Sequence, residues 1–437
     1  MTARCARSRT PTEGTSGEAF RQESAMPCRD LRQMKNSYFL DSMRAQEKWR
    51  VEECLNLLPS ENATSPQVRA LLSSDFVNRY TLPIEAEYCG SYLENGYRGT
   101  RITTEVERKA EQVARQVFAC KHACVQPLSG HIAAMIVIAS VMKRGDTLLA
   151  VGPDYGGYDG YAPPYIPDIL GLKSKELPFD QMIHNVDSEK AADMIRKEKP
   201  KLVILGASAI LFPYDMGPIR DACREARSVL AFDGSHVLGL IAGGEFQRPL
   251  KEGADILYGS THKSFFGPQG GIILTNSEDI DKRIRKNLTW RLVDNAHWNR
   301  IASLGHALLE MRKFGPQYAK QVIKNSQRLG KELKYRGFPV MFEERGFSKS
   351  HQLLYDSREL KAIYGLSVND FSVRMEKSNV IIDSVGRIGT SEITRMGFKE
   401  KHMPALADIF MAAANGEDVK AGVRQMRDRF DLAFRFR

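Results

Sequence analysis

The stretch LYGSTHKSFFGPQGGIIL, residues 257–274, indicates how the rest of the chain folds. An apolar, strand-like run ends at Ser260-Thr261, presents His262 and Lys263, and returns through a glycine-rich segment into a second apolar run. We therefore expect a lysine on a tight turn between two buried strands. Burial lowers the pKa of a lysine, and a lysine that loses its proton near neutrality can form a Schiff base with a carbonyl. The alternative is a surface lysine in a hairpin turn, and the small flanking residues weigh against it.

Length and composition indicate a globular protein of two or three domains, because the chain has 437 residues and a hydrophobic content of 42%. The formal net charge of +10 is spread along the chain without a nucleic-acid motif, so we expect no nucleic-acid partner. Seven cysteines without regular spacing fit a reducing, cytoplasmic setting and form no zinc motif. No apolar run reaches membrane-spanning length, so we expect no membrane span.

Four parts are predicted along the chain. Residues 1–36 are polar and lack apolar periodicity, so we expect a disordered tail, which is either a transit peptide or the product of an upstream start codon. Residues 37–75 form an N-terminal arm with a helix over 38–53, residues 76–310 a large domain, and residues 311–437 a smaller one. We expect an irregular loop at 78–102, a strand at 337–342 and a basic amphipathic helix at 418–437.

Short apolar strands alternate with helices through the middle of the chain. The predicted strands are Thr147–Val151, Leu202–Leu205, Val229–Phe232, Ile256–Tyr258 and Gly271–Leu274. This rhythm predicts a mostly parallel sheet covered by helices, and ligand sites in such sheets lie at the carboxyl ends of the strands. The residues that directly follow these strands, and that we expect to share one edge, are Tyr155, Ser208, Asp233, His236, His262 and Lys263.

Two segments of the chain have the groups that a cofactor site needs. Ser129 and Gly130 precede the apolar helix expected at 132–142, and the free backbone N–H groups of a helix start can hold phosphate, although any N-cap serine has the same pattern. Asp233 ends a buried strand, where an unpaired carboxylate is too costly. Together with Lys263 it indicates pyridoxal phosphate (PLP), which needs a lysine and an acidic partner for its pyridinium nitrogen.

Six motifs resemble the serine hydroxymethyltransferase family, especially its archaeal members. They are LPSENATSP (58–66), VQPLSG (125–130), FDGSHVLGL (232–240), STHK (260–263), GPQGG (267–271) and RIGT (387–390). They occur in the family's order and span roughly residues 37 to 415. The resemblance implies an α/β enzyme of PLP-dependent fold type I, which is aspartate aminotransferase-like. Such an enzyme has a mostly parallel seven-stranded sheet domain and a smaller α+β C-terminal domain, and forms a homodimer with shared active sites or a tetramer.

On the cofactor side, the resemblance implies a role for each motif residue. Lys263 would carry PLP, Asp233 would pair with the pyridine nitrogen, and His236 would lie against the ring. Ser208 would bond the phenolic oxygen of the cofactor. The residues expected to hold the phosphate and to stack on the ring are Ser129, Gly130 and Tyr155.

On the substrate side, the resemblance implies that Ser60 and Arg387 bind the carboxylate of an amino acid. Glu61 would be the acid or base beside the substrate hydroxyl. Tyr80 would reach the neighbouring site across the dimer, and His262 precedes the lysine as it does in the family.

Departures from the family lie on the side that would bind a pterin. Residues 80–82 read Tyr-Thr-Leu where an acidic residue is expected, and residues 295–297 read Asn-Ala-His in place of a glycine pair. The segment 379–387 has no room for the loop that precedes the carboxylate-binding arginine in the family. Whether tetrahydrofolate or another pterin takes part is left open, and we expect little or no dependence on ordinary folate.

Three functions are compatible with these residues. The leading one is an aldol-type transferase or lyase that interconverts a serine- or threonine-type β-hydroxy-α-amino acid and glycine plus an aldehyde or one-carbon unit. It would act as a hydroxymethyltransferase, aldolase or transaldolase. The second is an amino-acid racemase on the same scaffold. The third is a non-catalytic binding protein, and the joint presence of Lys263, Asp233 and Arg387 argues against it.

Overall fold

The computed structural model describes residues 36–88 and 90–436, without the side chains of 83–88 and 91–94. It divides into two units, residues 1–52 and 53–437, and each is described by itself. In the first unit, α2 (Tyr38–Glu47) continues into the π-helical segment Lys48–Glu53, so the helix expected over 38–53 is confirmed. The tail expected at residues 1–36 lies outside the described residues apart from Asn36.

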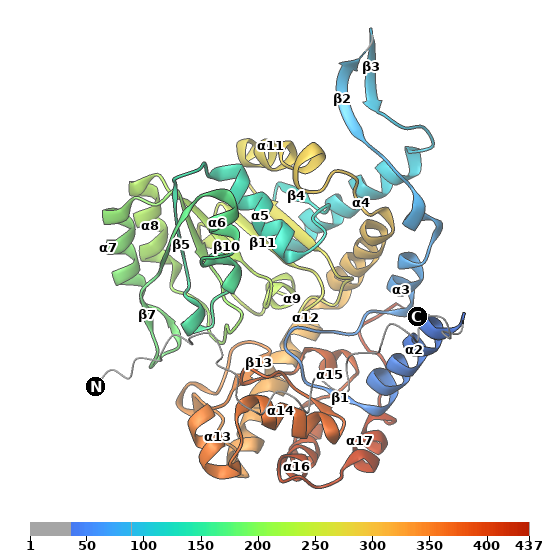
Figure 1. The fold of residues 1–437 in the computed structure, drawn as a ribbon, viewed down its shortest axis with the longest axis vertical. Helices are drawn as coiled ribbons and strands as arrows, with labels where there is room; N and C mark the ends of the chain where they lie inside the picture. Colours follow the sequence, from blue (N-terminus) through green and yellow to red (C-terminus); the bar gives the residue numbers. More distant parts are fainter. Residues whose placement is uncertain (1–35, 89, 437) are drawn as a thin grey trace, which may run out of the picture. The chain divides into compact units, whose positions relative to one another are not determined.

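A seven-stranded sheet is the centre of the second unit (Figure 1). Its spatial order is β4-β12-β11-β10-β9-β5-β6. The strands are β4 (His122–Cys124), β5 (Thr147–Ala150), β6 (Lys173–Glu176), β9 (Leu202–Leu205), β10 (Val229–Asp233), β11 (Ile256–Ser260) and β12 (Gly271–Thr275). All neighbours pair in parallel except β12, which is antiparallel to both β11 and β4. The mostly parallel sheet expected from the strand–helix rhythm is therefore confirmed.

Both faces of this sheet are buried under helices. Successive side chains of a strand point to opposite faces, so one strand contributes to the apolar clusters on both sides. In β9, Leu202 and Ile204 belong to one apolar cluster, whereas Val203 and Leu205 belong to another. The first cluster includes side chains of α5 (Gly130–Val141) and α11 (Glu278–Lys286). The second includes side chains of α4 (Arg101–Phe118), α7 (Ser188–Glu198), α8 (Met216–Ala226) and α12 (Trp298–Tyr335).

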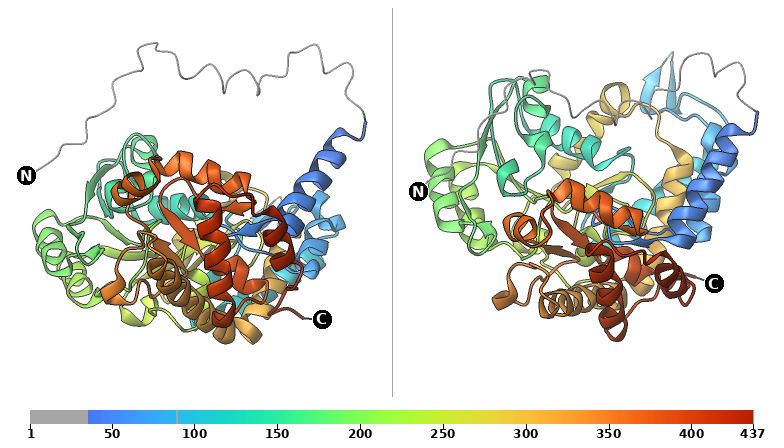
Figure 2. Two further views of the ribbon diagram at one scale, coloured as in Figure 1. Left: turned by 90° about the horizontal axis from the view of Figure 1, so that it is seen from below. Right: turned by 60° about the horizontal axis from the view of Figure 1, so that its bottom comes forward.

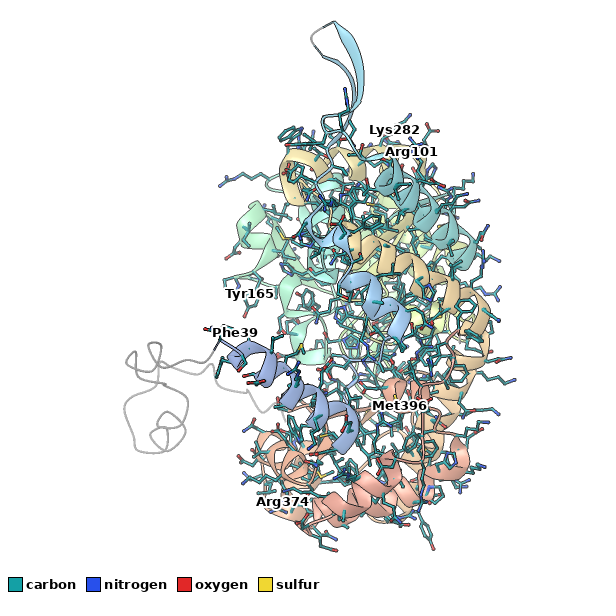
Figure 3. All side chains as sticks on the ribbon, turned by 90° about the vertical axis from the view of Figure 1, so that its right-hand side faces the viewer. Phe39, Arg101, Tyr165, Lys282, Arg374 and Met396 are labelled. Carbon is teal, nitrogen blue, oxygen red and sulfur yellow. The ribbon has the colours of Figure 1, made fainter. Side chains whose placement is uncertain are left out.

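A polar contact joins α11 to α4 near the end of the sheet. Arg285 of α11 donates to the Glu111 carboxylate of α4 at 3.2 Å and to the backbone oxygen of Ala123 at 3.1 Å. In Figure 3 the labelled side chains Lys282 and Arg101 mark these two helices, which lie close together there as they do in Figure 1.

The long helix α12 leads from the sheet region into a second apolar core. That core combines residues from position 329 onward with Leu55 and Leu57. Its strands are β1 (Leu55–Asn56) parallel to β14 (Val380–Ile381), and β13 (Gln352–Leu354) antiparallel to β15 (Arg387–Gly389). Its helices are α13 (Ser357–Tyr364), α14 (Val368–Lys377), α15 (Ser391–Arg395), α16 (Met403–Ala414) and α17 (Lys420–Arg427), coloured orange to red in Figure 2. The domain boundary predicted at residues 310/311 falls inside α12.

Three predicted segments differ from the structure. Residues 78–102 are not wholly irregular, because β2 (Pro83–Tyr88) and β3 (Ser91–Asn95) form an antiparallel hairpin that stands out from the sheet region in Figure 1. The strand predicted at 337–342 is only an isolated bridge between Val340 and Tyr355. The helix predicted at 418–437 is confined to α17.

The remaining α-helices and strands are short. They are α3 (Pro66–Leu72), α6 (Ile166–Leu170), β7 (Phe179–Asp180), β8 (Asn185–Val186), α9 (Leu238–Ala242) and α10 (Pro249–Glu252). Among the helices of the described residues, none combines the length and the apolar character that crossing a membrane requires.

Candidate active site

One cavity lies where the carboxyl ends of β9, β10 and β11 meet the start of α5. It is lined by Gly130, His131, Tyr158, Ala207, Ser208, Asp233, Ser235, His236, Ser260 and Lys263. The fold thus brings together five of the residues singled out in the sequence, although the first and last of them are 133 positions apart (263 − 130). The common edge follows from the parallel strand order.

Lys263 is held in the loop between β11 and β12 by bonds to its backbone neighbours. The N–H of Thr261 donates to Gly270 O at 3.0 Å, and the Thr261 hydroxyl donates to Pro268 O at 2.7 Å. Asn62 donates from Nδ2 to Lys263 O at 2.8 Å. Burial lowers the pKa of the Lys263 amine, against the opposing attraction of Asp233, and the positive charge of Arg387 lowers it further. The amine is therefore available as a nucleophile closer to neutral pH than a surface lysine is.

Asp233 is held by two donors. The Tyr161 hydroxyl donates to Oδ2 at 2.6 Å, and the Ser235 N–H donates to Oδ1 at 2.9 Å. The Tyr161 and Tyr258 hydroxyls also lie 2.6 Å apart. Burial raises the pKa of Tyr161 well above its ordinary value, so this residue remains a donor. No local sequence pattern marks Tyr161 as a site residue, since 72 positions separate it from Asp233.

The start of α5 closes tightly on the end of β11. Ser129 caps the helix, its hydroxyl oxygen accepting the Ile132 N–H at 3.1 Å. A Cβ on Gly130 would lie 2.1 Å from Ser260 Oγ and 3.2 Å from Ser260 N, so a larger residue there would require Ser260 to move. Free N–H groups at the helix start and the Ser260 hydroxyl form a cradle for an anion.

Tyr158 is the aromatic side chain of the segment after β5 that lines the cavity, and its hydroxyl lies 2.8 Å from His131 Nδ1. The ring of Tyr155 instead stacks on Phe179, with centroids 5.1 Å apart and planes 9° apart. The structure therefore does not bring Tyr155 together with the other cavity residues. Tyr155 is the predicted stacking residue, and Tyr158 is the second tyrosine of the same Tyr-Gly-Gly-Tyr pattern at residues 155–158.

Arg387 is fixed at the edge of the cavity by an acidic side chain from its own turn. Its Nε donates to Asp383 Oδ2 at 2.6 Å, and its Nη1 donates to Ser208 O at 2.6 Å. Asp383 Oδ1 also accepts the N–H groups of Val385 at 3.0 Å and of Arg387 at 2.9 Å. The guanidinium is thus held in one orientation, with Nη2 outside both of these bonds.

The segment that carries Ser60 and Glu61 lies between β15 and the lysine loop. Gly389 N–H donates to Leu57 O at 2.7 Å on one side, and Asn62 bonds the lysine loop on the other. Both Ser60 and Glu61 are half-buried there. Their roles toward a substrate stay predictions.

Two predicted residues have other surroundings. The Tyr80 hydroxyl donates to Asp294 Oδ2 at 3.0 Å, its ring lies 4.8 Å from that of Tyr97, and it is 44% exposed. Its predicted role across a dimer stays a prediction. His262 Nδ1 is buried and has no hydrogen-bond partner among the described residues, and burial lowers the pKa of this imidazole to about 4.

The residues of the cavity fit PLP. Lys263 supplies an amine, Asp233 supplies a carboxylate, and Gly130 lets the start of α5 approach Ser260 closely, so that backbone N–H groups and a hydroxyl lie together at the cavity. These are the groups that would meet an aldehyde carbon, a pyridine nitrogen and a phosphate.

Comparison with known proteins gives one consistent result. The family model described as serine hydroxymethyltransferase matches residues 35–410. The serine hydroxymethyltransferase of Methanobrevibacter smithii is 40% identical over 86% of this chain and 90% of its own length, and that of Methanocaldococcus jannaschii is 38% identical over 87% and 90%. The crystal structure of L-threonine transaldolase from Pseudomonas fluorescens superposes with a TM-score of 0.80 at 24% identity, covering 93% of this chain and 95% of that one. The predicted fold type I is confirmed.

Proposed function

Because the chain belongs to the serine hydroxymethyltransferase family and is a PLP-dependent enzyme of the hydroxymethyltransferase or aldolase type, we propose that it makes and breaks the Cα–Cβ bond of a β-hydroxy-α-amino acid without folate. The observation that carries the proposal is the convergence of Lys263, Asp233 and Arg387 around one cavity edge. Ser208 lines that cavity, and its carbonyl oxygen accepts from Arg387. Serine and threonine are the substrate class.

Each residue has a defined task in this reaction. PLP held at Lys263 supplies an electron sink that stabilises negative charge at the substrate Cα. Asp233, held by Tyr161 and Ser235, keeps a proton on the pyridine nitrogen by its negative charge. Arg387 binds the substrate carboxylate through the guanidinium edge that Asp383 leaves open. Glu61 takes the proton of the substrate β-hydroxyl as the Cα–Cβ bond breaks.

Independence from folate is supported by the turn before Arg387. Only residues 383–386 separate Ile382 from β15, and the Asp383 carboxylate bonds two backbone N–H groups within that turn. A turn so short and so fully bonded leaves no loop for holding a pterin. The acceptor in our proposal is accordingly a free aldehyde, which adds to the glycine carbon in the reverse direction.

We further propose a homodimer with shared active sites. Tyr80 and Tyr97 form an exposed aromatic pair beside Asp294, on the segment that the family resemblance assigns to the neighbouring site. Large exposed aromatic side chains of this kind are typical of protein–protein contacts. Sedimentation of the purified protein measures the oligomeric state, and a monomer at working concentrations would contradict this part of the proposal.

The decisive experiment supplies PLP, glycine and acetaldehyde to the purified protein and measures formation of a β-hydroxy amino acid, with and without tetrahydrofolate. We expect product formation that folate does not accelerate. Lys263→Ala should remove both the activity and the visible absorption of bound PLP. Lys349→Ala, which replaces an exposed lysine, should keep both.

Two outcomes would contradict the proposal. Exchange of the α-proton or formation of a D-amino acid without carbon–carbon cleavage would identify a racemase. A serine-to-glycine reaction that requires tetrahydrofolate would identify a folate-dependent hydroxymethyltransferase and would refute the argument from the short turn.

A further inference from the structure

Gln352 of β13 is buried beside the cavity, and its amide has only one possible orientation. Its Oε1 accepts the Ile210 N–H at 3.0 Å, and its Nε2 donates to Ser208 O at 2.9 Å. A backbone N–H can only donate and a carbonyl oxygen can only accept, so these two bonds determine which amide atom is nitrogen. The second hydrogen of Nε2 points to His236 Nδ1 at 2.9 Å.

This amide determines the protonation of His236. Because Gln352 Nε2 is a donor, His236 Nδ1 must be an acceptor and carries no proton. A neutral imidazole with an unprotonated Nδ1 carries its proton on Nε2. An imidazolium would place N–H against N–H, so Gln352 disfavours that form as well.

The Nε2 of His236 faces the lysine amine, with 3.4 Å between it and Lys263 Nζ. If Nε2 is the donor, the amine must accept with its lone pair, and only a neutral amine has one. An ammonium at Lys263 would lose this bond. We propose that Gln352 is a positioning residue that fixes the Nε2–H tautomer of His236, and that His236 in turn holds Lys263 as the neutral, nucleophilic amine.

The charges around His236 support this assignment. The ionisable groups that act on His236 are Lys263, Arg387, His351 and His262. Asp233, which lines the same cavity, acts in the opposite direction on Lys263, because its charge favours the ammonium form. Burial is the largest cause that lowers the pKa of His236 well below its ordinary value, and the positive charge of Arg387 acts in the same direction. The neighbouring ring of His351 is stacked at 6.0 Å, and burial lowers its pKa to about 3, so both imidazoles are neutral near pH 7.

The inference rests on the proposed function in one respect, namely that Lys263 is the attachment point of PLP. Its consequence is that the amine is ready for the carbonyl of the cofactor without a separate base to deprotonate it. A histidine of the opposite tautomer would instead accept from an ammonium and stabilise the unreactive form.

The test measures the midpoint pH at which the Lys263 amine reacts in the protein without cofactor. The reaction is reductive methylation with formaldehyde and cyanoborohydride across a pH series, and peptide mass spectrometry measures the product. Only the neutral amine reacts. In the unmodified chain we expect Lys263 to have a lower midpoint pH than exposed Lys349, which serves as an internal reference. In Gln352→Glu, the new carboxylate accepts from His236 Nδ1–H, so the midpoint of Lys263 should rise by about one unit, a tenfold loss of labelling below it. Gln352→Met removes the Nε2 donor, and with it the Oε1 acceptor of the Ile210 N–H, without adding a charge, and should give a smaller rise.

A double-variant comparison separates the tautomer from direct charge effects. In a His236→Phe background, Gln352→Glu should shift the midpoint no further, because the imidazole that transmits the effect is gone. The matched control is Gln247→Met, since Gln247 is also buried and its amide bonds the backbone of Tyr214, which is not among the residues that line the cavity. It should leave Lys263 unchanged.

Two results would overturn the inference. One is an unchanged Lys263 midpoint in Gln352→Glu and Gln352→Met proteins that unfold cooperatively. The other is an equal shift with and without His236. Neither measurement uses PLP or a substrate, so a failure of the aldol assay alone would count against the proposed function and leave the role of Gln352 standing.

Discussion

Gly130→Ala tests the cofactor cradle directly. The added Cβ would lie 2.1 Å from Ser260 Oγ and 3.2 Å from Ser260 Cβ and N. The hydroxyl can rotate, but the backbone nitrogen cannot, so the start of α5 and the end of β11 must separate or the Ser260 side chain must turn into the cavity. Either change alters the position assigned to the phosphate.

The expected loss of PLP affinity follows from these contact distances. Overpacking of this kind typically costs about 1–3 kcal/mol, which corresponds to a loss of PLP affinity of about 5- to 150-fold when the strain falls on the bound state. The assay is a titration of the cofactor-free protein with PLP, followed by visible absorption, with the thermal midpoint of the free protein measured alongside.

Gly217→Ala is the matched control, because Gly217 also lies in the first turn of a helix. A Cβ there would meet only Asp215 Oδ1, at the ordinary contact distance of 3.5 Å. Alanine favours helix over glycine by up to about 1 kcal/mol, so this variant should be at least as stable and should bind PLP normally. Equal PLP affinity in the two variants would refute the cradle.

Two further predictions concern stability. Glu310→Gln should lower the free energy of unfolding by about 3–5 kcal/mol, because Glu310 and Arg395 form a fully buried ion pair at 2.7 Å and the change leaves a buried charge unpaired. The control variant Glu278→Gln, at an exposed ion pair, should have no measurable effect. Similar denaturant midpoints for the two variants would contradict this prediction. Burial raises the pKa of Glu111 from 4.5 to about 7, so the folded state binds the carboxyl proton of Glu111 more tightly than the unfolded state does. The free energy of unfolding should therefore fall by about 2–3 kcal/mol as the pH rises from 4.5 to about 7. Glu111→Gln should flatten the slope, measured by urea unfolding at pH 4.5 to 7.5, and an unchanged slope would exclude Glu111 as its source.

Elements with strong local signals were predictable from the sequence. The sequence of Val368–Lys377 predicts a helix, and it forms α14 with these bounds, because Ser367 caps the helix by accepting the Asp370 N–H. The strand expected at Leu202–Leu205 has the bounds of β9, a run of four apolar residues that is buried on both faces. In both cases the residues that make the element are adjacent in the chain.

Elements that depend on distant packing were not predictable in this way. The C-terminal helix ends at Arg427, and the chain then turns so that Phe434 packs on Tyr318 and Phe436 on Phe314, both in α12. The segment expected to form a strand at 337–342 forms only one bridge, at Val340, and its last residue, Phe342, has a φ of 62° that is outside the extended region. The sequence shows these aromatic residues, but it does not show the surface of α12 on which they pack.

For the site, the sequence by itself determined which reactive residues follow the strands. Lys263, Asp233 and Ser208 were found this way, because parallel strands present their carboxyl ends at one edge. Only the tertiary structure decided their partners: Tyr161 for Asp233, Tyr158 in place of Tyr155 at the cavity, and Gln352 for His236. Gln352 and His236 are 116 positions apart, and a hydrogen bond across that distance leaves no period or motif in the chain. The protonation state of Lys263 depends on that bond, because the bond determines which ring nitrogen of His236 carries the proton.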